Sequence, residues 1–359
     1  MFADDVKYLC CPLTRESLEI SRISLKDRDG EILEGELASK ISGNKYRISN
    51  GIPRFLEDSQ YNETWDYKWT AIDQGQGLNY RITDKNDPAY EIHDIFDRNN
   101  HGGQAYQYAT GRLVLDLGCG IGQYTWRLLQ EFAPAKVISM DLTRGVDIFR
   151  QIMLERFPEL KTKILMVQGN VFAMPFKDET FDYVFSLGVL MHTGNTREAI
   201  RQAARVLKYH GQLNIWIYAP DVVHYDVREV GRDKVFTMFS FIPHQLQYAI
   251  VMGQINFFRR VPHWVAVSII KLFSSDAWYR ICNIRYLRYF AQKIFGTVMH
   301  PDRDYRFINN YDGWCNTWAD TWSEHEIFPV LQEQNIVIKG ISQWRTGIWG
   351  VKLKDFYKV

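Results

Sequence analysis

The chain has 359 residues, of which 46% are hydrophobic and 24% charged, and its formal net charge is +1. That length exceeds one ordinary compact core and predicts two units, or one domain with a large insertion. The near-neutral charge argues against a protein that coats nucleic acid, because phosphate binding needs clustered lysine and arginine.

The first part of the chain predicts a small β-rich domain over residues 1–58. Polar and apolar residues alternate there in short runs, with turn signals at Asp29-Gly30 and Ser42-Gly43-Asn44. Residues 59–110 are polar and aromatic, which indicates a connector that is helical in part. A small β-rich unit and a partly helical connector are therefore expected before the main domain begins.

From residue 111 onward, apolar strands alternate with helical patterns. The predicted strands are Arg112–Asp116, Val137–Asp141, Ile164–Gln168, Asp182–Ser186, Leu213–Tyr218, Ile336–Ile341 and Thr346–Leu353. The predicted helices between them are Gly122–Phe132, Val146–Arg156, Asn195–Leu207 and Ser323–Gln334, the last two opened at capping-box spacing. This order predicts an α/β fold with a doubly wound, mostly parallel seven-stranded sheet whose last strand is antiparallel. The main domain is expected over 111–218 and 323–359, with a helical insertion over 219–322.

The sharpest motif is the glycine-rich stretch Val114–Gly122, which follows a strand and precedes a helix. The dinucleotide fingerprint fails here, because its third glycine would fall on Gln123. Asp116 would repel a pyrophosphate and suits the cationic amino end of a methionine moiety instead. Asp141 ends the next strand, where a carboxylate accepts hydrogen bonds from both ribose hydroxyls.

These features resemble class I S-adenosylmethionine-dependent methyltransferases with a ubiquinone/menaquinone-methylase-like core. Three later stretches, Gly169–Phe176, Phe181–His192 and Leu207–Gly211, resemble further motifs of that family in the same order. Asn170 stands where the family usually has Asp, and Met191 replaces the first of two histidines.

The resemblance implies a Rossmann-like methyltransferase sheet and S-adenosyl-L-methionine as cofactor, with S-adenosyl-L-homocysteine as product and no metal. It implies that the following residues bind the cofactor: Asp116, Gly118, Cys119, Gly120, Gly122, Asp141, Leu142, Asn170, Val171 and Leu187. His192 follows the fourth strand and is the candidate base for an acceptor that carries a proton. The alternative is that His192 only bonds the backbone and shapes the pocket.

The segments Leu9–Leu13 and Asn44–Leu56 resemble a small zinc-ribbon family that activates methyltransferases. Cys10 and Cys11 are adjacent and no second cysteine pair follows at ligand spacing, so we predict that zinc is absent and that both thiols are buried. Five irregularly spaced cysteines predict no disulfide framework, and the amino-terminal residues do not resemble a secretory signal. A cytoplasmic location is the simpler expectation.

Residues 235–300 are aromatic and contain seven basic residues against one acid, Asp276. Pro243 and Pro262 are expected to divide this stretch into separate helices. Three interpretations remain open: a helical cap, a lid whose cations attract an anionic substrate, or a peripheral contact with anionic lipid.

Two aromatic groups lie in positions where related enzymes face cofactor or substrate. Trp65, Tyr67 and Trp69 are expected to close over the cofactor, and Tyr311, Asp312 and Trp314 to face the substrate.

The predicted function is methyl transfer to a small-molecule acceptor, either a secondary metabolite or a sugar- or lipid-linked intermediate, with anionic or aromatic character. No nucleic-acid partner is expected. The alternatives are an RNA methyltransferase with a fused activator domain, and a cofactor-binding scaffold without catalysis.

Overall fold

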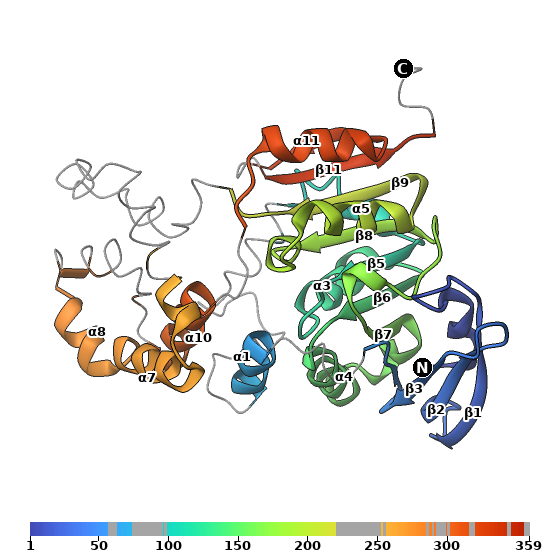
Figure 1. Cartoon of the computed structure of the whole chain (residues 1–359), viewed down its shortest axis with the longest axis horizontal. Helices are drawn as coiled ribbons and strands as arrows, with labels where there is room; N and C mark the ends of the chain where they lie inside the picture. The colour runs from blue at the N-terminus through green and yellow to red at the C-terminus, as the bar shows by residue number, and fades with distance from the viewer. Residues whose placement is uncertain are drawn as a thin grey trace.

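The computed structural model describes residues 1–56, 63–73, 96, 99–219, 253, 256–284, 287–288, 291, 299, 302–315, 320–342 and 346–354. A small antiparallel sheet lies at one end of the molecule, beside a seven-stranded sheet (Figure 1). Helices α7, α8 and α10, which come late in the chain, lie at the opposite end (Figure 1). Within the described ranges, no helix combines the length and apolar character needed to cross a bilayer.

The large sheet has the strand order β10-β11-β9-β8-β5-β6-β7. Its strands are β5 (Leu113–Leu117), β6 (Lys136–Asp141), β7 (Ile164–Gln168), β8 (Phe181–Leu187), β9 (Leu207–Trp216), β10 (Ile336–Ile341) and β11 (Gly347–Lys352). The pairs from β9 to β7 are parallel, whereas β11 runs antiparallel to both β9 and β10. The predicted α/β fold with seven strands and an antiparallel last strand is therefore confirmed.

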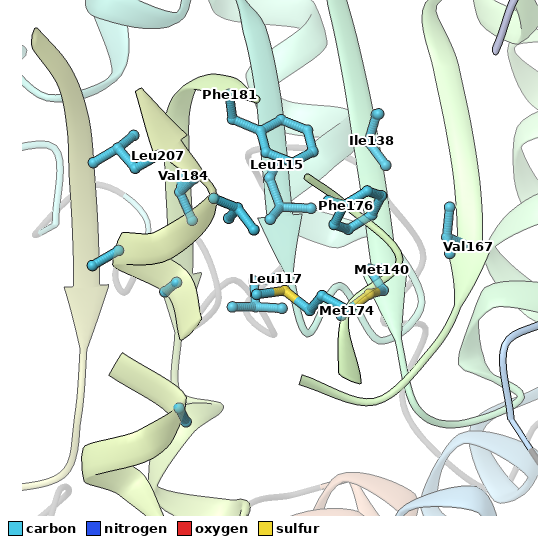
Figure 2. Close-up of a cluster of buried hydrophobic side chains, with 14 of the residues drawn as sticks. Leu115, Leu117, Ile138, Met140, Val167, Met174, Phe176, Phe181, Val184 and Leu207 are labelled. Carbon is cyan, nitrogen blue, oxygen red and sulfur yellow. The ribbon is translucent and has the colours of Figure 1, made fainter. Parts of the chain in front are cut away.

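Helices cover both faces of this sheet. Successive residues of each strand point to opposite faces, and since the parallel strands β5 to β8 are mostly apolar, both faces must be buried. Val114 packs on α3 (Gln123–Phe132) and α4 (Gly145–Arg156), while Leu115 packs on the side of α5 (Thr196–Val206) and α11 (Glu324–Glu333). Figure 2 shows the second of these cores, where side chains from five parallel strands meet Met174 and Phe176.

Two of the predicted helix starts are formed by side-chain caps. The Asn195 side chain accepts a hydrogen bond from the Glu198 amide at 3.1 Å and begins α5. At the start of α11, the Ser323 amide donates to the Glu326 carboxylate at 2.8 Å. Both contacts supply partners for backbone groups that a helix end would otherwise leave unpaired.

One strand begins earlier than predicted. β9 starts at Leu207 rather than at Leu213. Residues 208–211, which the sequence prediction assigned to neither a helix nor a strand, form an irregularity within β9, since the pairing of β8 with β9 shifts register between Phe181 and Tyr183. Such a bulge carries residues typical of turns without ending the strand.

The predicted β-rich unit at the start of the chain is a four-stranded antiparallel sheet in the order β1-β2-β3-β4. Its elements are the 3-10 helix η1 (Ala3–Tyr8) and the strands β1 (Leu18–Lys26), β2 (Ile32–Ser39), β3 (Lys45–Ser49) and β4 (Ile52–Pro53). Gly30 and Gly43 occupy the two predicted turns. Cys10 and Cys11 are both buried, and the Cys11 sulfur lies 3.1 Å from the Tyr46 hydroxyl.

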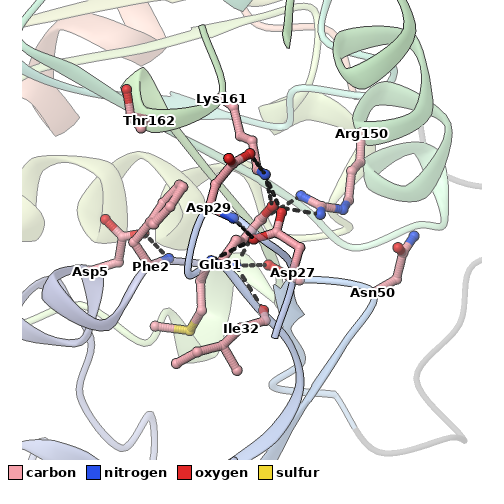
Figure 3. Close-up of polar contacts among 12 residues, drawn as sticks. Phe2, Asp5, Asp27, Asp29, Glu31, Ile32, Asn50, Arg150, Lys161 and Thr162 are labelled. Carbon is pink, nitrogen blue, oxygen red and sulfur yellow. Dashed lines mark hydrogen bonds and ion pairs between the residues drawn. The ribbon is translucent and has the colours of Figure 1, made fainter. Parts of the chain in front are cut away.

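Buried charges join this unit to the large domain. The Glu31 carboxylate accepts hydrogen bonds from both terminal nitrogens of Arg150 at 2.7 and 3.0 Å, and lies 3.3 Å from the Lys161 ammonium (Figure 3). Lys161 also contacts Asp27 and Asp29 of the same small sheet. The buried part of this cluster, Glu31 with Arg150, is expected to add little net stability but to favour one relative placement of the two surfaces. The small sheet is thus fixed against α4 and the 3-10 helix η4 (Pro158–Lys163).

The insertion has its own core. It includes α7 (His263–Phe273), α8 (Asp276–Cys282) and α10 (Arg303–Trp314), and α1 (Glu63–Asp73) of the connector packs against α10. Pro262 caps α7, as predicted, whereas Pro243 lies outside the described residues.

Tyr311 and Trp314 do not lie where the sequence suggested. Both are buried in the core of the insertion, and the Tyr311 hydroxyl lies 2.9 Å from the His263 ring nitrogen Nε2. Their aromatic rings serve packing rather than an open substrate surface. The side chain of Asp312 is outside the described part of the structure.

Candidate active site

The topology marks one edge of the large sheet as the place for a ligand. β5 lies between β6 and β8, and the chain runs outward from β5 to β7 before it crosses back to β8. A crevice forms at the carboxyl ends of strands where the order reverses in this way. Here that point lies at the carboxyl ends of β5 and β8.

The glycine-rich loop occupies this edge, and its glycine positions have no room for a side chain. Gly118 and Gly122 have φ angles of +86° and +81°, in the left-handed region that favours glycine. A Cβ at Gly118 would lie 2.3 Å from Val189, and one at Gly122 would lie 2.1 Å from the ring of Phe149. The Gly118 amide also donates to the Met140 carbonyl at 2.8 Å, which attaches the loop to β6.

Asp141, at the end of β6, connects the loop to the next segment. Its Oδ2 accepts a hydrogen bond from the Gly120 amide at 2.7 Å, and its Oδ1 accepts from the amide and hydroxyl of Thr143 at 2.9 and 2.7 Å. Burial raises the pKa of Asp141, and the bonds from Thr143 and Gly120 oppose that rise. Oδ1 already accepts two hydrogen bonds, whereas Oδ2 accepts one and has a further lone pair that can accept from a ribose hydroxyl. The ribose contact itself stays a prediction.

Asp116 lies beneath the loop. It is only 1% exposed and accepts a hydrogen bond at 2.6 Å from the Thr125 hydroxyl, which in turn lies 2.8 Å from the Ser139 hydroxyl. Burial raises the pKa of Asp116 to about 7, although the bond from Thr125 lowers it. The structure therefore shows Asp116 supporting the turn from β5 into α3, and a direct contact with the amino end of a ligand stays a prediction.

Asn170 and Val171 lie just after β7. The Asn170 side-chain oxygen accepts from the Phe172 amide at 2.9 Å and caps η5 (Val171–Ala173). The oxygen predicted to meet an adenine amino group already has this partner, with a second lone pair left. Val171 is half-buried beside it.

The other predicted cofactor residues line the same edge. Cys119 and Leu187 are buried in the core between the sheet and α3, at the ends of β5 and β8. Leu142 is half-buried, and its carbonyl accepts from the Gln168 side chain at 3.2 Å. All ten predicted positions thus lie at or directly after the carboxyl ends of β5, β6, β7 and β8.

His192 lies in an aromatic enclosure after β8. It belongs to the 3-10 helix η6 (Leu190–His192) and is 8% exposed. Its ring meets Trp65 of α1 at 5.0 Å and Tyr218 at 5.3 Å between centroids, both in edge-on geometry. A second ring of α1, Trp69, stacks near Trp65 at 6.2 Å.

Helix α1 lies across both parts of the site. A Cβ at Gly120 would be 2.8 Å from the Trp69 ring, so that ring rests on the glycine loop. The buried Lys68 ammonium lies 4.7 Å from the Trp65 ring and 4.9 Å from the Trp69 ring. Trp65 and Trp69 of the aromatic segment singled out in the sequence therefore cover His192 and the loop. Tyr67, predicted with them, instead packs on His263 and Tyr311 in the core of the insertion.

Two functional contacts could not be found from motifs. Arg54 of the small sheet donates to both carboxylate oxygens of Asp147 at 2.9 and 2.5 Å, and to the Gln168 side-chain oxygen at 2.7 Å. Asp66 of α1 accepts from the Arg144 amide at 2.7 Å. Both contacts hold the segment that carries Asp141, and only the folded arrangement brings their partners together.

Comparison with known proteins agrees with this geometry. Residues 115–215 match the family described as "Methyltransferase domain". This part of the chain is a class I S-adenosylmethionine-dependent methyltransferase domain. S-adenosylmethionine is accordingly the methyl donor that the domain implies.

Three relatives show how widely such domains are used. The chain is 31% identical to the erythromycin 3''-O-methyltransferase of Saccharopolyspora erythraea, over 37% of this chain and 42% of the relative. It is 33% identical to the demethylmenaquinone methyltransferase of Lactococcus lactis, over 29% and 41% of the two chains. It is 31% identical to the tRNA U34 carboxymethyltransferase of Saccharophagus degradans, over 28% and 31%. The chain spans less than half the length of each of these relatives.

The residues at the edge of the sheet fit the donor that the family implies. The loop needs glycine at positions 118, 120 and 122, because a Cβ there would collide with Val189, Trp69 or Phe149. Asp141 offers a carboxylate at the end of β6. These two features suit a nucleoside with vicinal hydroxyls, joined to an amino acid.

Proposed function

We propose that this chain transfers a methyl group from S-adenosylmethionine to a small-molecule acceptor by in-line displacement. The observation that carries the proposal is the meeting of the glycine loop, Asp141 and His192 at one sheet edge beneath α1. When bound, the donor supplies a methyl group already activated by a sulfonium. The new bond from the acceptor to that methyl carbon forms as the bond to sulfur breaks.

The protein's part in such a reaction is mainly to align the groups and to exclude water. The loop of Gly118–Gly122 and Asp141 would hold the amino-acid and ribose parts, and Asn170 with Val171 would border the base. Trp65 and Trp69 close the site from the side of α1. The small sheet supports the same site through Arg54, which is consistent with a fused activator-like unit.

His192 is the proposed base for an acceptor that must lose a proton, such as a hydroxyl or an acidic carbon. The rings of Trp65 and Tyr218 set its orientation and give the pocket an aromatic wall. That wall suits an apolar or aromatic acceptor. Removing the imidazole should therefore slow turnover without weakening the binding of the donor.

A variant pair tests this role. His192→Ala should bind S-adenosylmethionine like the unchanged protein in calorimetry and should lose about 10²–10⁴-fold in turnover, the usual contribution of a positioned base. His192→Gln keeps most of the volume and should lose as much, with the acid limb of the pH–rate profile removed. Full activity in both variants would reduce His192 to shaping the pocket.

The donor is tested first, by calorimetric titration with S-adenosylmethionine beside NAD and ATP. Micromolar and selective binding supports the proposal, and equal or absent binding contradicts it. Release of S-adenosylhomocysteine is then measured with anionic, aromatic, sugar-linked and lipid-linked acceptors, and with bulk tRNA. Turnover on tRNA alone would favour an RNA methyltransferase. Donor binding without turnover on any acceptor would favour a scaffold.

A further inference from the structure

Large apolar side chains are exposed along one stretch of the insertion. These side chains are Phe257, Trp264, Leu272, Ile281, Ile284 and Leu287. Trp264 is 72% exposed, Leu272 65%, and Ile281 and Ile284 60% each. Single exposed apolar residues are normal, but several on neighbouring helices indicate a surface that meets an apolar partner.

The spacing within α7 shows that these residues share a face. Trp264, Ser268, Lys271 and Leu272 recur at helical spacing, and all are exposed. Ala266 and the residues that face α10 are buried on the other side. A helix that only packs on a core presents polar residues to water. The outer face of α7 instead presents an indole and a leucine, with Ser268 between them and Lys271 beside them.

The next helix continues the pattern. Arg280 and Ile281 of α8 are exposed, and so is Ile284, which follows the helix three residues after Ile281. Cys282 between them is buried. α8 packs against α7, so the two outer faces belong to one part of the molecule. Figure 1 places α7 and α8 at the end farthest from the small sheet.

The charged residues in this stretch of the chain are nearly all positive. Residues 256–288 contain six basic residues and a single acid, Asp276. The carboxylate of that acid lies 2.5 Å from the buried Arg306 guanidinium, so its charge is balanced within the protein. The exposed basic residues of this stretch include Arg260, Lys271 and Arg280.

We propose that this outer face of the insertion (Phe257, Trp264, Lys271, Leu272, Arg280, Ile281 and Ile284) docks peripherally on an anionic lipid surface. Apolar and indole side chains enter the boundary between headgroups and acyl chains, and cationic groups meet the negative headgroups. Positive charge beside exposed apolar residues is complementary to that surface. The proposal goes beyond methyl transfer and does not depend on which acceptor is used.

The test is flotation of the full chain with phosphatidylcholine vesicles, with and without phosphatidylglycerol, in the absence of any methyl donor. The chain should float with the anionic vesicles, not with the neutral ones, and less so as salt is raised, because exposed charges are screened. The double variant Trp264→Ser with Ile281→Ser should reduce the bound fraction at least about tenfold. Lys271→Glu with Arg280→Glu should abolish binding at low salt.

Matched controls separate this face from the rest of the surface. Ile41→Ser changes an apolar residue of the small sheet that is 84% exposed, and Lys339→Glu changes an exposed charge on β10. Both controls should bind vesicles like the unchanged protein. Titration with S-adenosylmethionine on the same preparations confirms that each variant is folded. The flotation assay is run without S-adenosylmethionine, so its result does not depend on methyl transfer. A failure of the proposed methyl transfer can therefore be told apart from a failure of lipid docking.

Four results would overturn the proposal. Flotation could be absent with both vesicle types, or equal with both. The outer-face variants could also bind as well as the controls. A dimer in light scattering that Trp264→Ser with Ile281→Ser dissociates would assign this face to a second copy of the chain instead.

Discussion

Arg54→Ala should weaken cofactor binding although Arg54 belongs to the small sheet and not to the methyltransferase domain. The guanidinium bonds Asp147 on one side of the segment after β6 and Gln168 on the other. Gln168 in turn donates to the Leu142 carbonyl, next to Asp141. Removing Arg54 therefore leaves Asp147 and Gln168 without this partner. Both of these residues contact the segment that carries Asp141, the proposed ribose ligand.

The magnitude follows from the bonds that are lost. A hydrogen bond to a charged group contributes about 1.5–3 kcal/mol, and Arg54 makes such bonds to Asp147 and one further bond to Gln168. Asp147 is about a third exposed, so water recovers part of this energy in the variant. We expect a loss of about 2 kcal/mol in the free energy of unfolding. Cofactor binding should be weakened by about half of this amount, about 1 kcal/mol, which raises the Kd for S-adenosylmethionine roughly fivefold.

Calorimetry with S-adenosylmethionine and thermal unfolding give the two readouts. Arg54→Lys should be intermediate, because an ammonium cannot reproduce the paired bonds of a guanidinium. Lys40→Ala is the control: it removes an exposed ion pair with Glu19 in the same small sheet and should change neither readout. An unchanged Kd with a lowered Tm would show that Arg54 only fixes the small sheet in place. No change in either quantity would refute the argument altogether.

Two further substitutions test residues of the loop. Asp141→Ala should weaken binding of S-adenosylmethionine by about 1–3 kcal/mol in a calorimetric titration, since the ribose loses its proposed acceptor and the Gly120 amide loses its partner. Asp116→Asn tests the buried carboxyl through the pH dependence of Tm. Because burial raises the pKa of Asp116 to about 7, above about 4 in the unfolded chain, its contribution to stability is present below pH 4 and lost as the pH rises through 7. The Tm of Asp116→Asn relative to the unchanged protein should therefore increase between pH 5 and pH 8, and a constant difference would contradict the buried placement.

The sheet and the loop could be predicted because both depend on local pattern. Strand and helix periods alternate along the chain, and the loop needs glycine wherever a Cβ would strike Val189 or Phe149. Asn195 and Ser323 mark helix starts by their own hydrogen bonds. Such signals are complete within a few residues, so no knowledge of tertiary contacts is needed.

The predictions that failed, and the contacts that were missed, depend on packing between distant segments. Tyr311 and Trp314 have the composition of a substrate wall, yet they pack with Phe258 in the core of the insertion. Residues 208–211 were assigned to no strand, yet the pairing of Leu207 and Gln212 with β8 on either side makes them part of β9. The burial of Asp116 likewise depends on Thr125, which only the turn into α3 brings under the loop.

The segment after β6 shows why the motifs alone do not determine the site. It is held by the Gly120 amide, by Arg54 and by Asp66, and only Gly120 lies within the residues that match the methyltransferase family. The other two supports come from the small sheet and from α1, which also rests Trp69 on the loop. A fragment limited to the matched residues would keep every motif and lose both outer supports. We therefore expect the affinity for the donor to depend on the small sheet, the connector helix and the methyltransferase domain together, because each contacts the same carboxylate-bearing segment.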